Sequence, residues 1–343
     1  MKVGITGATG FIGGRLLRRM LTDGYEVKCL VRNAAKGKVL EKLGAEIYKG
    51  DLSDPDTLKD FPIGCEYIFH IAAFVSDWGK KYEFYKNNVQ ATKILLEASR
   101  KHDVKRFIFM SSSTVVWNSS FWKIHNLENI NETYPCPEKH SDHYNNSKYL
   151  AERAVLDFSK NNVLESVVIR PSNVWGAGDT VILPRIAKAA KKKFLIPMGS
   201  GNNETTPCHV DNLVESMILA STSDNVSGKV YFINDGTKIN YYKFLQDQLH
   251  AADISWTPKF KIPYKLGYSL AFVLEILFKI IRSQKPPVLT RFAVAALSGN
   301  RSYSITRAKN DLKYSPVITY TEGLKRLREW VINIGGKEKL LEY

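Results

Sequence analysis

A glycine-rich turn near the start of the chain constrains the fold more strongly than any other segment. In the run Thr6-Gly7-Ala8-Thr9-Gly10-Phe11-Ile12-Gly13, the glycines follow a G-x-x-G-x-x-G pattern between an apolar strand and an amphipathic helix. Glycine permits a tight turn and a close approach of the backbone to a pyrophosphate, and the helix N-terminus offers free N–H groups to phosphates. The pattern predicts a dinucleotide site whose contacts are Gly7, Thr9, Gly10, Phe11, Ile12 and Gly13.

Short apolar runs alternate with amphipathic stretches along much of the chain. Apolar residues recur at helical spacing between the runs, as in residues 12–21 and 89–98. This alternation predicts an α/β fold of Rossmann type, a doubly wound parallel sheet, with a smaller and mainly helical C-terminal lobe for the substrate. We expect the dinucleotide-binding domain to comprise 1–170 and about 207–235, and the substrate-binding lobe to comprise about 171–206 and 236–343. The expected strands are 3–6, 27–31, 46–48, 67–71, 106–110, 166–169 and 229–234, and a long helix is expected over 143–160.

The composition argues against several classes of protein. Of the 343 residues, 44% are hydrophobic and 24% are charged, which excludes wholesale disorder and a polytopic membrane protein. The 49 basic and 34 acidic residues give a net charge of +15, but the basic residues are dispersed without an RNA-recognition signature. We therefore expect no nucleic-acid partner. Four widely spaced cysteines and a start without a signal-peptide pattern favour a cytoplasmic location. His140 and His143 have a ligand-like spacing but no partner cluster, so no metal is expected.

Residues after the second and third expected strands indicate which dinucleotide is bound. A carboxylate at the end of the second strand would hold the ribose 2′-hydroxyl of NAD, whereas an arginine suits the 2′-phosphate of NADP. The chain has Arg32 there, with Lys36 nearby, which favours NADP over NAD. An ordinary solvated arginine is the alternative. Asp51 and Leu52 follow the third strand, where a loop carboxylate can hydrogen-bond adenine.

A tyrosine and a lysine four residues apart predict a proton-transferring pair. Tyr144 and Lys148 share one face of the expected 143–160 helix. Free tyrosine has a pKa of about 10, too high for a general base at neutral pH, and a nearby ammonium group lowers that pKa. Three serines, 111–113, follow the fifth strand at the edge where open α/β sheets bind ligands. One of these hydroxyls can hold a substrate oxygen while Tyr144 moves its proton.

Together these motifs resemble those of the extended short-chain dehydrogenases/reductases, which include nucleotide-sugar epimerases, dehydratases and 3β-hydroxysteroid dehydrogenases. The resemblance covers nearly the whole chain and implies that Ser113, Tyr144 and Lys148 are catalytic, with the lysine also binding the nicotinamide ribose. Ser113 is preferred to Ser112 because it precedes a stretch similar to the family's S-A-T-V-Y, but a register shifted by one residue stays open. A homodimer is also suggested. The same resemblance places further residues beside the cofactor: Ala72, Ala73, Asn88, Ser111, Pro171 and Asn173.

Departures from the family pattern indicate which branch of the family this chain resembles. Dehydratases carry an Asp-Glu pair after the catalytic hydroxyl, where this chain has Thr114 and Val115. Nucleotide-sugar enzymes usually place an arginine where this chain has Thr205, and a threonine cannot make a bidentate charged contact with a diphosphate. Residues 170–179 instead resemble the hydroxysteroid-dehydrogenase branch, although Asn173 is also common among sugar epimerases.

The stretch 266–281 is the most apolar in the chain and allows three interpretations. It is too short to span a bilayer, and it contains Glu275 and Lys279. The stretch is expected to be a core helix, a lid on an apolar pocket or a peripheral membrane contact. Basic residues precede and follow it, which is compatible with the lid and with the membrane contact. The last two interpretations fit a lipophilic small-molecule substrate.

The sequence therefore predicts an NAD(P)-dependent dehydrogenase/reductase of the extended short-chain type. It would interconvert a secondary alcohol and a ketone on a bulky lipophilic substrate, either 3β-hydroxysteroid-like or β-keto. The first alternative is a nucleotide-sugar epimerase with tightly bound NAD. The second is a non-catalytic NAD(P)-binding scaffold, against which the intact Tyr144 and Lys148 argue.

Overall fold

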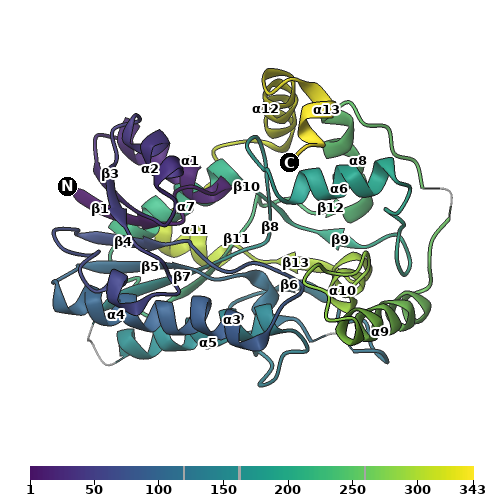
Figure 1. Ribbon diagram of the computed structural model, residues 1–343, viewed down its shortest axis with the longest axis horizontal. Helices are drawn as coiled ribbons and strands as arrows, with labels where there is room; N and C mark the ends of the chain where they lie inside the picture. The colour runs from purple at the N-terminus through teal and green to yellow at the C-terminus, as the bar shows by residue number, and fades with distance from the viewer. Residues whose placement is uncertain (119, 161–163, 259) are drawn as a thin grey trace.

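A seven-stranded sheet forms the centre of the larger lobe (Figure 1). The computed structural model describes residues 1–118, 120–160, 164–258 and 260–343. Neighbouring strands of this sheet are parallel, in the order β11-β7-β5-β4-β1-β2-β3. The order reverses between β1 and β4, and open α/β sheets bind ligands at the carboxyl edge beside such a reversal. The strands are β1 (Lys2–Thr6), β2 (Glu26–Val31), β3 (Glu46–Lys49), β4 (Tyr67–His70), β5 (Arg106–Met110), β7 (Glu165–Pro171) and β11 (Val230–Ile233).

Helices cover both faces of this sheet, as Figure 1 shows. One buried cluster joins the sheet to Leu16 of α1 and Met217 of α7, and the other joins it to Leu95 of α4 and Val155 of α5. The strands are apolar on both sides because both faces are covered. The predicted Rossmann-type sheet is therefore confirmed. The helices of this lobe are α1 (Phe11–Thr22), α2 (Ala34–Glu41), α3 (Lys81–Phe84), α4 (Ala91–Lys101), α5 (His143–Lys160), α7 (Val210–Thr222) and α11 (Thr306–Leu312).

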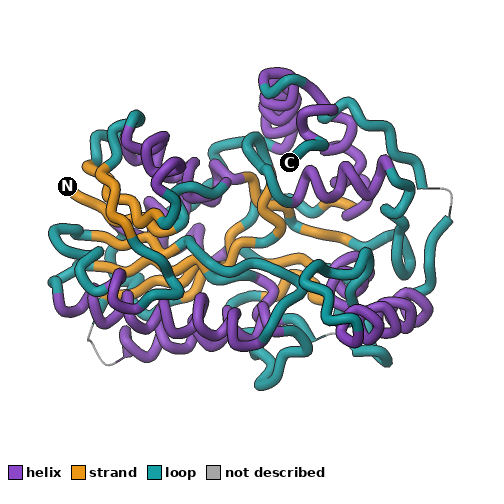
Figure 2. Tube along the Cα trace, in the orientation of Figure 1, coloured by secondary structure: helices purple, strands orange, loops and turns teal. Residues whose placement is uncertain are grey.

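The smaller lobe is mainly helical, and Figure 2 shows its short strands among the helices. Its core packs Trp175 and Leu183 against Phe244, Leu249 and Leu327. The strands form a sheet in the order β12-β9-β13-β6 and a separate β10-β8 pair. These strands are β6 (Leu127–Ile130), β8 (Asn173–Trp175), β9 (Glu204–Thr205), β10 (Pro207–His209), β12 (Ile239–Asn240) and β13 (Arg301–Tyr303). The helices are α6 (Ile182–Lys191), α8 (Tyr241–Ala251), α9 (Tyr264–Ile280), α10 (Arg291–Ser298), α12 (Tyr320–Asn333) and α13 (Gly336–Leu340).

The long elements lie where the sequence predicts them. Helix α5 begins and ends at the predicted residues, His143 and Lys160, and β11 returns to the large sheet beside β7. The strands of the smaller lobe were not predicted, because runs of two to four residues are too short to show a period of two. Among the residues that the structure describes, no helix is both long and apolar enough to cross a bilayer.

Candidate active site

The turn between β1 and α1 presents backbone rather than side chains at the carboxyl edge of the sheet. Gly7 has a φ of +81°, and a Cβ there would lie 2.8 Å from the nitrogen of Ala72. A Cβ on Gly13 would overlap the carbonyl oxygen of Gly7, so close packing of α1 on the turn requires glycine. Gly10 precedes α1 without a side-chain cap, which leaves the helix N-terminus available to a phosphate. The turn therefore fits a dinucleotide pyrophosphate, and it also contains Thr9, Phe11 and Ile12.

A chain of buried polar groups supports this turn from the sheet side. The Thr6 hydroxyl accepts the N–H of Ala72 at 3.1 Å and contacts Nδ1 of His70 at 2.8 Å. The other ring nitrogen of His70 contacts the Thr92 hydroxyl at 3.0 Å, and that hydroxyl donates to the Asn88 carbonyl at 2.6 Å. Burial lowers the pKa of His70 to about 3, so its ring is neutral. The network holds the loop after β4, which contains Ala72 and Ala73, against the glycine turn.

The predicted adenosine end of the site has both a cation and a carboxylate. Nη1 of Arg32 lies 3.6 Å from Oδ2 of Asp51, and the Arg32 side chain is 78% exposed. Burial raises the pKa of Asp51, but the N–H of Ser53 and the Arg32 guanidinium outweigh this and hold that pKa below its usual range. Lys36 lies exposed on α2, and Leu52 packs against the second core cluster. The Arg32 guanidinium therefore lies exposed beside the Asp51 carboxylate.

Tyr144 lies in the first turn of α5, beyond the carboxyl end of β5. The start of this helix is fixed by Asp142, which accepts the backbone N–H of Asn145 at 2.7 Å and its side-chain amide at 2.8 Å. Burial raises the pKa of the Tyr144 phenol to about 12, and a hydrogen bond with Ser112 opposes this shift. At neutral pH the phenol therefore holds its proton unless a cation lowers its pKa.

The structure brings Ser112, rather than Ser113, to Tyr144. The Ser112 hydroxyl opposes the rise in the pKa of the phenol, and it lies 2.8 Å from the Thr114 hydroxyl. Ser113 is buried at the start of a 3₁₀ turn and bonds instead with Tyr303 of β13. The backbone at Ser112 is extended, and successive side chains of an extended segment point in opposite directions. A shift of one residue therefore decides which hydroxyl faces the phenol.

Lys148 is buried one helical turn after Tyr144. Its Nζ donates to the carbonyl of Met110 at 2.5 Å and lies 4.3 Å from the centre of the Phe109 ring. Burial lowers the pKa of Lys148 to about 7, and the carboxylate of Glu152 opposes this shift. A lysine whose pKa lies near neutrality, beside a tyrosine at a sheet edge, is typical of a functional site.

A buried ion pair lies behind Lys148, and the sequence reasoning did not identify it. Nε of Arg170 lies 3.0 Å from Oε2 of Glu152, and a second guanidinium nitrogen contacts Oε1. The Ser111 hydroxyl donates to the same carboxylate at 2.6 Å. The structure thus places Ser111 in a network that joins β5, α5 and β7. The available signal was the charge of Arg170, directly after the predicted apolar strand 166–169, together with Glu152 on the predicted helix 143–160.

Asn88 joins the loop after β4 to the helix that carries Tyr144. Its side chain accepts the N–H of Phe74 at 2.7 Å and donates to the Phe74 carbonyl at 3.1 Å and the Ser147 hydroxyl at 2.9 Å. It belongs to a π-helical segment, Tyr85–Gln90, of a kind frequent at functional sites. Asn88 therefore positions α5 relative to the cofactor cradle.

The segment after β7 leads from the large sheet into the smaller lobe. Pro171 ends β7, and Asn173 begins β8. The Asn173 amide donates to the hydroxyl of Thr205 at 2.9 Å, and Thr205 is buried. The position where nucleotide-sugar enzymes place an arginine thus holds a short, neutral side chain engaged by Asn173.

A pocket of about 590 Å³ adjoins Tyr144. It is bounded by the loop after β4, the start of α5 and helices α9 and α10. Helix α9, which contains most of the apolar stretch 266–281, therefore forms part of its wall. The indole N–H of Trp78 donates to the Ser283 carbonyl at 3.0 Å and joins two of these walls. The sequence could not identify this lining, because it comes from segments distant in the chain. Its aromatic members are Trp78, Phe84, Tyr144, Tyr268, Phe278 and Phe292, and its charged members include Asp77, Lys80, Asp142, Glu275, Lys279, Arg282 and Arg291.

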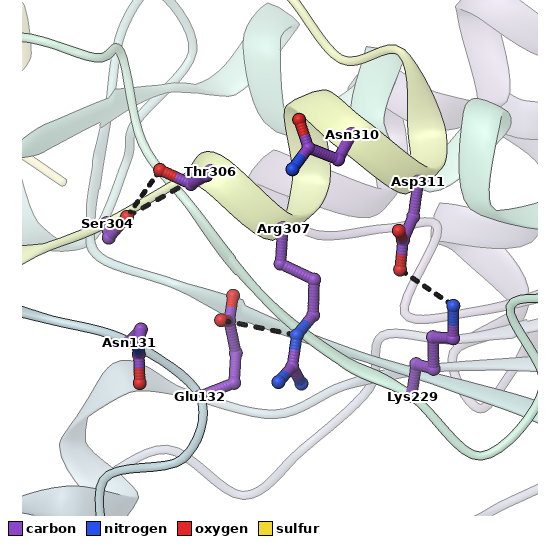
Figure 3. Close-up of a pocket in the computed structure, with 8 residues that line it drawn as sticks. All are labelled: Asn131, Glu132, Lys229, Ser304, Thr306, Arg307, Asn310 and Asp311. Atoms are coloured by element: carbon purple, nitrogen blue, oxygen red, sulfur yellow. Dashed lines mark hydrogen bonds and ion pairs between the residues drawn. The ribbon is translucent and has the colours of Figure 1, made fainter.

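A second pocket, of about 600 Å³, is polar and lies elsewhere (Figure 3). It is lined by Lys229, which precedes β11, so it lies at the amino end of that strand and away from the ligand-binding edge. Its charges are paired with one another: Lys229 with Asp311 at 2.8 Å, and Arg307 with Glu132 at 3.6 Å. We therefore assign the active site to the pocket beside Tyr144.

The site combines a pyrophosphate cradle on an open α/β sheet with a tyrosine and a buried lysine one helical turn apart beyond β5. This arrangement defines an oxidoreductase of the extended short-chain dehydrogenase/reductase type. Residues 4–263 match the 3-beta hydroxysteroid dehydrogenase/isomerase family, and the chain belongs to that family.

Known proteins similar to this chain include two reductases. This chain is 30% identical to a 4-hydroxy-2-methyl-3-oxo-4-farnesyl-3,4-dihydroquinoline-1-oxide ketoreductase of Stigmatella aurantiaca, over 96% of each chain. It is 27% identical to a 2-alkyl-3-oxoalkanoate reductase of Shewanella oneidensis, over 94% of this chain and 84% of that one. A UDP-glucuronic acid 4-epimerase of Bacillus cereus, solved in complex with NAD, has the same fold with a TM-score of 0.72. It covers 97% of this chain and 99% of its own, at 20% identity, which shows the fold alone.

Proposed function

We propose that the protein interconverts a secondary alcohol and a ketone on a bulky lipophilic substrate, with NAD or NADP as cofactor. The observation that carries the proposal is the position of Tyr144, which lines a pocket of about 590 Å³ while Lys148 lies one turn behind it. Pockets of this size hold ligands of several rings or a branched chain. A proton-transferring group thus borders a chamber that suits such a substrate.

The residues at the carboxyl edge fit a nicotinamide dinucleotide. The uncapped N-terminus of α1 and the Gly7 turn would hold the pyrophosphate, and Asp51 would lie beside the adenosine. Lys148 would reach the nicotinamide ribose, as the family resemblance implies. When bound, the nicotinamide accepts a hydride from the carbinol carbon or donates one to the ketone carbon. The NAD-bound epimerase of the same fold supports this choice of cofactor.

Tyr144 handles the proton that accompanies this transfer. In the oxidising direction its phenolate takes the proton of the substrate hydroxyl, and in the reducing direction its phenol donates a proton to the ketone oxygen. Burial raises the pKa of Tyr144 to about 12, so the oxidising direction needs a group that lowers it. An ammonium group on Lys148, one turn away, would lower it. The Ser112 hydroxyl acts in the same direction by hydrogen bonding.

A preference for NADP follows from the exposed guanidinium of Arg32. Its 3.6 Å contact with Asp51 is long for an ion pair, and a 2′-phosphate could replace it with charged hydrogen bonds. Lys36, exposed in the first turn of α2, is a second cation close to Arg32 in the sequence. Asp51 opposes this effect, because its carboxylate repels a phosphate, so the preference depends on Arg32.

The pocket walls indicate the substrate class. Trp78, Phe278 and Phe292 supply aromatic surface against which rings or alkyl chains pack. The two relatives named above support this assignment, because their names describe 3-oxo compounds that carry a farnesyl or an alkyl group. A sugar diphosphate would find Thr205, already bonded by Asn173, where its guanidinium partner is expected.

Turnover of the purified protein with NADP or NAD tests the proposal against two panels, lipophilic alcohols and ketones on one side and UDP-sugars on the other. We expect net change in reduced nicotinamide with the lipophilic panel, abolished by Tyr144→Phe. Tyr149→Phe, on the same helix, is the matched control and should keep its activity. Interconversion of a UDP-sugar without net cofactor change would instead establish the epimerase. Cofactor binding without turnover of either panel would establish the scaffold.

A further inference from the structure

Helix α9 has two unlike sides. Its inner side carries Tyr268, Glu275 and Phe278, which line the active-site pocket. Its outer side exposes large apolar residues to between 40% and 71%, whereas the outward face of a surface helix is ordinarily polar. These residues, with the one that follows the helix, are Leu266, Leu270, Phe272, Val273, Ile276, Leu277, Ile280 and Ile281. The polar residues among the exposed positions of α9 are Lys265, Ser269 and Lys279.

The two ends of this apolar face are basic. The exposed cations are Lys261 and Lys265 at the start, and Lys279, Arg282 and Lys285 at the end, where Lys279 and Arg282 also border the active-site pocket. Between residues 260 and 288 the sequence contains one acidic residue, Glu275, which is buried and paired with Arg291 at 2.8 Å. The face therefore combines apolar side chains with positive charge that no exposed carboxylate of its own segment neutralises.

An exposed tryptophan stands beside the same face. Trp122 is 78% exposed, and Nζ of Lys265 lies 5.5 Å from the centre of its ring. Tryptophan with lysine is typical of the boundary between lipid headgroups and acyl chains, where an aromatic ring and an ammonium group are both accommodated. Figure 1 shows α9 at the edge of the smaller lobe, beside α10.

An anionic lipid surface fits this face better than a second copy of the chain does. A twofold dimer would pack the face against itself, and both ends of the helix would then bring cations together without an exposed carboxylate to pair with them. Anionic headgroups complement both ends at once. An amphipathic helix lying in the plane of the interface also suits α9, whose 17 residues are too few to span a bilayer.

We propose that the outer face of α9, together with Trp122, binds the headgroup region of an anionic membrane. The pocket beside Tyr144 would then lie about one helix diameter, roughly 10 Å, from the lipid. A lipophilic substrate could enter from the bilayer without crossing water, and this consequence rests on the proposed function. The membrane contact itself rests on the exposed residues of α9.

Co-sedimentation of the full chain with vesicles tests the contact directly. The probes are phosphatidylcholine vesicles with and without added phosphatidylglycerol, at low and high salt. We expect binding to the anionic vesicles that weakens as salt rises, and at least about tenfold weaker binding for Ile280→Glu. Ile332→Glu, on α12, is the matched control, because Ile332 is 62% exposed and lies away from α9. Thermal unfolding of each variant checks that it is folded.

Three outcomes would overturn the proposal. They are failure of the wild-type chain to bind anionic vesicles, equal loss with Ile280→Glu and Ile332→Glu, and a dimer that Ile280→Glu converts to a monomer without any vesicle binding. The last outcome would assign the face to a second copy.

Vesicle binding needs neither cofactor nor turnover, so it can succeed where the proposed function fails. Delivery from the bilayer has a separate readout. Ile280→Glu should raise the KM for a ketone presented in vesicles and leave the KM for a freely dissolved ketone unchanged. An equal effect on both KM values would overturn delivery while leaving the membrane contact in place.

Discussion

Glu275 and Arg291 fasten helix α9 to helix α10 at the wall of the active-site pocket. Oε1 of Glu275 accepts the backbone N–H of Arg291 at 2.8 Å, and Oε2 accepts its side-chain Nε at 2.8 Å. Glu275 is buried although it belongs to a helix whose outer face is exposed. The pair therefore fixes the position of the helix that separates the pocket from the surroundings.

Glu275→Ala should loosen this wall. We expect the KM for a bulky ketone to rise several-fold while kcat for a small ketone changes little, because Tyr144 and Lys148 stay in place. The free energy of unfolding should fall by about 1–3 kcal/mol, since the Arg291 guanidinium loses a charged acceptor. Steady-state kinetics and denaturant unfolding measure both effects. Glu97→Ala is the control, because its pair with Arg100 on α4 is more than half exposed and contributes little.

Lys148→Met should separate activity from stability. Burial lowers the pKa of Lys148 to about 7 from 10.5, so the folded state bears the full cost of a buried ammonium below pH 7. This cost lessens as the pH rises from 7 to 10.5, because over this range the folded chain has released the proton while the unfolded chain still binds it. Allowing for the lost hydrogen bond to the Met110 carbonyl, we expect Lys148→Met to be more stable than the wild type at pH 6 by roughly 1 kcal/mol. This difference in stability should shrink by pH 9. Turnover should fall about a hundredfold or more. Lower stability than the wild type at both pH values would contradict the prediction.

Substitution of the two adjacent serines should distinguish their roles. Ser112 contacts the Tyr144 phenol and Ser113 contacts Tyr303, so Ser112→Ala should lower kcat by about tenfold to a hundredfold and Ser113→Ala should lower it less. Single-turnover kinetics with a lipophilic ketone would measure the difference. A larger loss of kcat with Ser113→Ala than with Ser112→Ala would identify Ser113 as the catalytic serine, as the motif predicts.

The sequence predicted those parts of the molecule that depend on local periodicity. Helix α5 is long enough for several turns of its apolar pattern to show, and this placed Tyr144 and Lys148 on one face at the correct helix boundaries. The glycine turn was predictable because Gly13 packs against the carbonyl of Gly7 within the same short motif, although the contact of Gly7 with Ala72 comes from a distant segment. Local sequence patterns of this kind can be recognised without knowledge of the tertiary structure.

Other features depend on contacts between distant segments, which no local pattern encodes. The sequence alone does not indicate that Glu152 and Arg170 interact. The fold brings them together as a buried ion pair. The 266–281 stretch could not be assigned as core, lid or membrane contact, because its partners come from the loop after β4 and the start of α5. The choice between Ser112 and Ser113 depends on a backbone register that a serine run leaves undefined.

Cofactor preference should change on substitution of Arg32. Arg32→Asn removes the exposed guanidinium at the end of β2 and should lower kcat/KM with NADP by about tenfold or more, with little change for NAD. Lys38→Asn, an exposed cation on the same α2 helix, should leave both values unchanged. Equal losses with both cofactors would show that Arg32 supports the fold of the site rather than a 2′-phosphate.

Asp142→Asn should change two pH dependences. Burial raises the pKa of Asp142 to about 6 from 3.8, so the folded state binds the proton more tightly and loses stability as pH rises from about 4 through 6. The variant should lack this loss and be more stable at pH 7 by roughly 1–2 kcal/mol. Its new amide N–H can be accepted by Oδ1 of Asn145, which is buried without a hydrogen-bond partner among the described residues.

The kinetic consequence of the same substitution follows from charge. The Asp142 carboxylate raises the pKa of Tyr144, so the variant should reach its half-maximal rate of alcohol oxidation at a lower pH than the wild type. Asp157→Asn is the control, because Asp157 lies exposed on the same helix, far along from Tyr144. A matching shift in the control would attribute the effect to the overall charge of α5. No shift in either variant would mean that ionisation of Tyr144 does not limit oxidation, and the assignment of the phenolate as the base would then fail.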